Sequence, residues 1–145
     1  MSIFPIFNDI NVIEENTSLS TKYKEPLFDY KSGKTVIKDG KTIMTTKEQH
    51  IQQYITLLIR TAVDKFKVYQ NTDFGLTDLY EQQGHQILTT PFAIEEIKRE
   101  LEEKCLKNKN IELVTNIDIT VDFNTVNIEM TVQVEGKEII TGVAI

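Results

Sequence analysis

The carboxylates that acid–base chemistry would need are concentrated in two stretches of the chain. The first stretch carries five glutamates: Glu95, Glu96, Glu100, Glu102 and Glu103. A pair of carboxylates flanking one sugar bond is the apparatus of most glycoside hydrolases, so polysaccharide hydrolysis is the first enzymatic hypothesis. The same stretch also holds acid-first pairs four residues apart: Glu95–Arg99, Glu100–Lys104 and Glu103–Lys107. That spacing is typical of surface ion pairs on a helix, so we expect a solvated helix face here.

The second acidic stretch contains Asp118 and Asp122, which fall on the polar side of an alternating, strand-like pattern. A catalytic carboxylic acid usually lies in an apolar pocket that raises its pKa. Nothing in the neighbouring residues indicates such a pocket. We therefore expect no catalytic residue, and keep a peptidoglycan hydrolase only as the alternative function.

The tripeptide Asp73-Phe74-Gly75 matches the magnesium-binding signature of protein kinases. The chain has no glycine-rich phosphate loop, no Val-Ala-Ile-Lys strand and no His-Arg-Asp loop, which a kinase also requires. The tripeptide is better explained structurally. Phe74 would anchor a loop in the core, and Gly75 would let the chain turn tightly, with a positive φ where needed.

Metal, cofactor and thiol chemistry have little support in the sequence. His50 lies near the start of a predicted helix and His85 in a predicted loop, and neither has a partner at ligand spacing. Cys105, the single cysteine, falls on an apolar helix stripe and is expected to be a small core residue. We expect no metal and no cofactor.

Composition narrows the classes of partner. The chain has 145 residues, enough for one domain, and a formal net charge of -6, which disfavours nucleic acid. No apolar run is long enough for a membrane span, and the first residues do not resemble a secretory signal. We expect neither nucleic acid nor membrane as a partner.

Two long helices should position these side chains. The first is predicted from Lys47 to about Val63, with a capping box that begins at either Thr45 or Thr46. The second is predicted from Pro91 to about Lys107, with Thr90 as its N-cap. Between them we expect a strand at residues 66–69 and a short helix at residues 76–83.

Along the sequence, strands are predicted before the first long helix and after the second. Turn signals at residues 31–34 and at Asp39-Gly40 delimit short strands near residues 35–38 and 42–44, the second turn being a type I′ candidate. Apolar residues alternate through residues 111–123 and again through 126–134, which predicts a long antiparallel hairpin. A last strand follows the turn at residues 135–137. The fold class is α+β, an antiparallel sheet on two main helices.

Residues 1–26 differ from the predicted domain at residues 27–145 because they show no sustained period. We interpret them as an extended arm. Its apolar residues are Ile3, Phe4, Ile6 and Phe7. They would either dock on their own domain or bind a groove or sheet edge of another subunit.

The order of these parts resembles a known family. The matching pieces are Asp29-Tyr30-Lys31, Asp39-Gly40-Lys41, Ile55–Thr61, Phe66–Tyr69, Phe74-Gly75 and Leu76–Leu79. They resemble the inner baseplate wedge proteins of contractile phage tails and phage-tail-like particles, in particular the XkdS-like branch of the sheath-initiator family. The resemblance spans residues 27–135. It departs at the family's Glu-Pro-Arg-Ile segment, where this chain has Asn108-Lys109-Asn110-Ile111 and only the isoleucine matches.

The resemblance implies a structural role: assembly of the inner baseplate and initiation of the sheath, in a phage, a prophage remnant or a bacteriocin. Implied partners are other wedge proteins, the sheath protein and tube or hub proteins, with assembly in the bacterial cytoplasm. Implied partner-binding residues are the arm, Asn108, Lys109 and Asn110, and a sheet edge, for which Ile139, Ile140 and Val143 are our first choice. A tail-completion or adaptor protein of another class is a third hypothesis, which a ring of the purified chain would favour over a wedge subunit.

Overall fold

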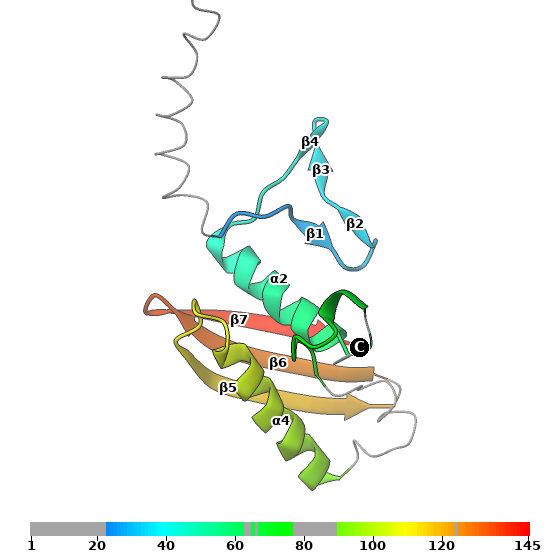
Figure 1. The fold of residues 1–145 in the computed structure, drawn as a ribbon, viewed down its shortest axis with the longest axis vertical. Helices are drawn as coiled ribbons and strands as arrows, with labels where there is room; N and C mark the ends of the chain where they lie inside the picture. The colour runs from blue at the N-terminus through cyan, green and yellow to red at the C-terminus, as the bar shows by residue number, and fades with distance from the viewer. Residues whose placement is uncertain (1–22, 63–64, 66, 77–89, 124) are drawn as a thin grey trace, which may run out of the picture. The chain divides into compact units, whose positions relative to one another are not determined.

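The computed structural model describes residues 23–62, 65, 67–76, 90–123 and 125–145 (Figure 1). The chain divides into two compact units, Met1–Gln53 and Tyr54–Ile145, which are described separately below. Two α-helices and several antiparallel strand pairs make up the described part, so the predicted α+β class is confirmed. The predicted arm at residues 1–26 lies outside the described residues except for its last four.

Unit 1 contains two short hairpins in succession. Their strands are β1 (Phe28–Asp29) paired with β2 (Lys34–Thr35), and β3 (Ile37–Lys38) paired with β4 (Lys41–Thr42). Asp39 and Gly40 connect β3 to β4 with φ values of 52° and 72°. Two consecutive positive φ angles define the predicted type I′ turn.

Residues 25–27, which precede β1, bond both to Val36, between β2 and β3, and to residues 43–45, after β4. The amide of Leu27 donates to Ile43 O (2.8 Å) and that of Val36 donates to Leu27 O (2.8 Å). Because Val36 turns its backbone toward Leu27, the single strand predicted near residues 35–38 is divided into β2 and β3. Pro26 forms an isolated bridge with Met44.

Helix α2 (Lys47–Arg60) begins with a capping box. Thr46 N donates to Gln49 Oε1 (2.9 Å) and Gln49 N donates to Thr46 Oγ1 (3.3 Å), so Thr46 is the cap and Thr45 is not. The helix ends three residues earlier than predicted. Thr61 O accepts from Leu76 N (2.9 Å), and Ala62 forms a parallel bridge with Leu76. This non-local pairing replaces the last predicted helical turn.

Helix α4 (Pro91–Leu106) in unit 2 follows the prediction closely. Thr90 Oγ1 accepts from Ala93 N (3.3 Å) and Pro91 is at the first position. The buried face comprises Ile97, Leu101, Lys104 and Cys105. This face turns α4 toward β5 (Figure 1).

The C-terminal sheet has the order β5–β6–β7, all antiparallel. Its strands are β5 (Leu113–Asp122), β6 (Thr125–Val134) and β7 (Lys137–Ala144). On β6, every second residue from Val126 to Val134 is at most 1% exposed, and the residues between them are exposed or half-buried. The predicted hairpin and final strand are therefore confirmed, with one buried and one open face.

The first part of β5 deviates from the predicted alternation. The register shifts between Val114 and Asn116, which leaves Thr115 as an extra residue. A bulge of this kind reverses the facing of the residues before it. Leu113 is consequently 48% exposed, although its position in the alternation predicts a buried side chain.

The strand predicted at residues 66–69 is wrong. Lys67–Tyr69 forms a 3₁₀ helix, η1, and Val68 is 82% exposed. Thr72 bonds back to Tyr69 O through both its amide (3.1 Å) and its hydroxyl (2.5 Å), which closes a turn. The predicted short helix at residues 76–83 lies, after Leu76, outside the described residues.

Candidate functional site

Strand β7 lies at an edge of the C-terminal sheet. The N–H and C=O groups of its successive residues point alternately toward β6 and away from it. Val126 and Ile145 exchange two hydrogen bonds of 2.8 and 2.9 Å. Every second residue counted back from Ile145 also bonds to β6; these residues are Val143, Thr141, Ile139 and Lys137. The N–H and C=O groups of Glu138, Ile140, Gly142 and Ala144 therefore point away from β6.

One outward group near the end of β7 has a side-chain partner. Arg60 Nη2 donates to Ala144 O (3.3 Å), which agrees with the direction that the alternation requires. For Glu138 and Gly142, no backbone partner is found within the described part of the chain. At Glu138 and Gly142, β7 thus presents outward-facing main-chain groups as a sheet edge.

The three residues predicted to form a partner-binding sheet edge all lie on β7. They are divided between the two faces of the strand. Ile139 (1% exposed) and Val143 (5%) belong to the core, whereas Ile140 is 60% exposed. A partner that pairs with the backbone would contact Ile140 directly. Ile139 and Val143 would act by holding β7 against the core.

The loop after η1 packs on aromatic rings. Phe74 is half-buried, with its ring centroid 4.9 Å from that of Tyr69 and 6.1 Å from that of Tyr54. Gly75 is buried and has a φ of 109°, a region that L side chains rarely adopt. This geometry supports the anchor-and-turn interpretation of both residues, which stays a prediction until the variants are measured.

Asp73 links this loop to α4. Lys104 Nζ donates to Asp73 Oδ1 (2.7 Å) and to Asp73 O (2.7 Å), and Lys107 Nζ pairs with Asp73 Oδ2. The pKa of Asp73 is lowered to about 2. The largest cause is the hydrogen bond from Lys104, and the second is the hydrogen bond from Lys107. The sequence carries a usable signal for this contact, because Lys104 lies next to Cys105 on the apolar stripe, where a charged side chain needs a partner.

These contacts correct two of the predicted ion pairs on α4. Lys104 and Lys107 face Asp73 instead of the predicted Glu100 and Glu103. The ion pairs found along the helix are Lys98–Glu95, Arg99–Glu96 and Arg99–Glu103. The predicted solvated face is present, with different pairings.

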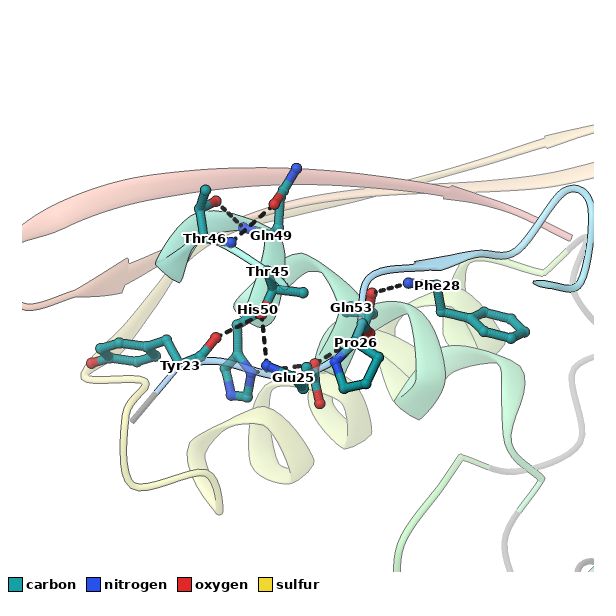
Figure 2. A network of polar contacts seen from close by, with 9 residues as sticks. All are labelled: Tyr23, Glu25, Pro26, Phe28, Thr45, Thr46, Gln49, His50 and Gln53. Carbon is teal, nitrogen blue, oxygen red and sulfur yellow. Dashed lines mark hydrogen bonds and ion pairs between the residues drawn. The ribbon is translucent and has the colours of Figure 1, made fainter. Parts of the chain in front are cut away.

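A polar network joins the end of the predicted arm to Thr45 and to the start of α2 (Figure 2). The buried hydroxyl of Thr45 accepts from Glu25 N (3.1 Å) and donates to Tyr23 O (2.6 Å). Gln53 Nε2 donates to Glu25 Oε1 (2.8 Å), and His50 Nδ1 lies 3.2 Å from the same oxygen. Residues 23–26 are thus held against the N-terminal half of α2. Ile3, Phe4, Ile6 and Phe7 lie outside the described residues.

The segment at the place of the family's Glu-Pro-Arg forms a tight turn from α4 into β5. Asn108 Oδ1 accepts from Asn110 N (2.9 Å), and Asn108 O accepts from Ile111 N (3.1 Å). Lys109 is exposed and Ile111 is 4% exposed. The matching isoleucine is therefore a core residue, and the three preceding residues occupy the surface turn.

The side chains that could react or bind metal are Cys105 and the histidines, aspartates and glutamates. Burial raises the pKa of the Cys105 thiol to about 12, so the reactive thiolate is disfavoured. No group of His, Cys, Asp and Glu that would hold a metal ion occurs among the described residues. No helix within the described ranges is long and apolar enough to cross a membrane.

Fold and site together define a small α+β protein whose sheet ends in an outward-facing edge strand. The sequence matches the family model of the contractile injection system sheath initiator over residues 24–138. The chain therefore belongs to the sheath-initiator family, and the resemblance stated for residues 27–135 is confirmed at that level. A search of the curated proteins finds no match.

Proposed function

We propose that this chain is a wedge component of the inner baseplate and that it starts sheath assembly by strand addition. In this role it joins other wedge proteins around the tail tube and offers an edge of its sheet to the first sheath subunits. It assembles in the bacterial cytoplasm and remains in the virion or released particle. The work is assembly and not catalysis.

The observation that carries this proposal is the outward-facing backbone of β7 in a member of the sheath-initiator family. An edge strand pairs with another chain unless its edge is protected. The core holds β7 through Ile139, Thr141 and Val143, which are at most 5% exposed. A firmly held strand loses little conformational entropy when a second strand pairs with it, which favours addition.

A proline at position 140 tests strand addition. The Ile140 N–H points away from β6, so Ile140→Pro removes an outward donor and keeps the β6–β7 ladder. Expressed with the other baseplate and sheath genes, the variant should fold and enter baseplates, while electron microscopy shows tails without sheath.

Ile140→Ala is the matched control because it removes the side chain and keeps the N–H. It should give sheathed particles, since main-chain hydrogen bonds supply much of the affinity in strand addition. Sheathed particles with Ile140→Pro would exclude this part of β7 as the docking edge. Thermal melting of both purified variants establishes that each is folded.

The remaining partner residues belong to the same proposal. The arm residues Ile3, Phe4, Ile6 and Phe7 would bind a groove or sheet edge of a neighbouring subunit. Asn108, Lys109 and Asn110 would contact another wedge protein at the surface turn. The contacts of residues 23–26 with Thr45 support the first point, because they fix the end of the arm next to α2.

A further inference from the structure

The double hairpin of unit 1 has no core of its own. None of residues 27–44 is buried. Three of its large apolar side chains are exposed: Ile37 by 66%, Met44 by 45% and Phe28 by 37%. Two-stranded hairpins are marginally stable alone, so the exposed apolar side chains favour a partner that covers them.

The same hairpins are basic within an acidic chain. Residues 27–44 contain four lysines, Lys31, Lys34, Lys38 and Lys41, against two aspartates, whereas the whole chain has a formal net charge of -6. All four lysines are exposed. Lys38 and Lys41 are direct cross-strand partners next to the turn, so two like charges lie side by side. This arrangement favours an acidic contact surface.

The open face of the C-terminal sheet has the opposite charge. Its carboxylates are Asp118, Asp122, Glu129 and Glu138. The strand positions of this face carry no lysine or arginine within the described residues. Asp118 lies directly opposite Glu129, a like-charge cross-strand pair that destabilises an isolated sheet.

A hollow lies beside this carboxylate pair. Gly142 is the neighbour of Glu129 on β7, and open space extends where its side chain would be. The hollow measures about 250 Å³, and its lining includes Asp118, Thr120, Asn127, Glu129 and Gly142. The ammonium end of a lysine would fit there and offset part of the charge of the two carboxylates.

We propose that the lysine-bearing double hairpin of one copy docks on the acidic open sheet face of a second copy. Lys38 and Lys41 approach Asp118 and Glu129, and the exposed Ile37 adds apolar contact. Two copies can make this contact once, head-to-tail, or twice about a two-fold axis, and the mass of the oligomer distinguishes the two arrangements. Its occupant is a second copy because this chain itself supplies the complementary charge.

This contact is independent of strand addition. It uses the open face of the sheet, whereas the proposed sheath contact uses the β7 edge. The two proposals can therefore fail separately. Association of the purified chain tests this contact alone, because the test of strand addition is the presence of sheath on the particle.

Charge reversal on each surface tests the contact. The variants are Lys38→Glu with Lys41→Glu, and Asp118→Lys with Glu129→Lys. Each keeps a like-charge cross-strand pair in place, so hairpin and sheet stability should change little. Analytical ultracentrifugation at about 50 mM salt should show self-association of the wild type that is lost at about 500 mM, because salt screens charges. Each reversal alone should weaken association by about tenfold or more.

Restoration is the decisive measurement. A chain carrying all four reversals should associate as the wild type does, and an equimolar mixture of the two reversal variants should form mixed oligomers. Glu95→Lys with Glu102→Lys shifts the net charge as much as the face variant does, and should leave the contact intact. A wild type that stays monomeric at low salt, or reversals that change nothing, would overturn the proposal.

Cross-linking keeps the test independent of any variant's folding. A carbodiimide joins lysines to carboxylates in direct contact. In a mixture of ¹⁴N- and ¹⁵N-labelled wild-type chains, mixed-isotope peptides should connect the hairpin lysines to Asp118 or Glu129. Mass spectrometry that finds no such mixed-isotope link in the associated fraction would contradict the proposed geometry.

Discussion

Gly75 occupies a backbone conformation that excludes most other residues. At a φ of 109°, a side chain is strained, and such strain costs on the order of 1–3 kcal/mol. Gly75→Val should therefore lower the free energy of unfolding by about that amount. Urea denaturation measures it, and Gly75→Ala should show most of the same loss, because the strain arises from any Cβ. Wild-type stability in both variants would contradict this account.

Phe74 tests the other half of the same motif. Truncating a fully buried Phe costs about 3–5 kcal/mol, and Phe74 is only half-buried, so Phe74→Ala should cost about 2 kcal/mol. Phe74→Leu keeps most of the apolar contact with Tyr54 and Tyr69 and should cost less. Thermal melting of both variants, compared with the wild type, checks the order.

At the scale of elements, Asp73 couples the loop to α4, and its low pKa makes this coupling dependent on pH. The pKa falls from 3.8 to about 2 on folding, so the stabilisation is fully present above pH 3.8 and is lost as pH falls through about 2. Asp73→Asn should lower the urea midpoint at about pH 6. The difference from wild type should disappear near pH 2.

Asp39→Asn is a suitable control for this pH experiment. Asp39 and Asp73 both have positive φ, at 52° and 58°, which asparagine tolerates well. No ion pair involves Asp39 in the described part of the chain, so its variant should match the wild type at both pH values. An Asp73→Asn variant with the wild-type midpoint at about pH 6 would show that the lysine contacts add no stability.

Sequence patterns correctly predicted the helices and strands that are determined by local sequence. Thr90 and Pro91 set the start of α4, and alternation through residues 126–134 set β6, because capping and two-residue periodicity are local properties. The errors arose from non-local partners. Leu76 ends α2 early by bonding to Thr61, and Val36 divides a predicted strand by bonding to Leu27.

The candidate site was predicted less completely for the same reason. The final strand was chosen as an edge, but its outward groups depend on the pairing of β7 with β6. Asp73 is separated by 31 residues from Lys104. Spacing along the sequence does not reveal a contact of that length, whereas the buried position of Lys104 on an apolar stripe is a usable signal.

At the scale of the whole molecule, hydrolysis of peptidoglycan is not expected. Glu95 and Glu96 have side chains that are 72% and 49% exposed, and Asp118 is exposed. An acid for glycoside hydrolysis needs a less solvated site. Turbidity of purified peptidoglycan should stay constant with the wild type. Lysis that disappears when all three residues are changed to amides would establish the enzyme and refute this expectation.

On the proposed role, Arg60 has a consequence for the geometry of the growing particle. Its guanidinium occupies the last outward carbonyl of β7, at Ala144. A strand displaced by one residue presents every side chain on the opposite face. On the proposed role, an incoming sheath strand is therefore stopped at Gly142, and this boundary sets its alignment. The angular phase of the first sheath ring would then depend on one arginine at the end of α2.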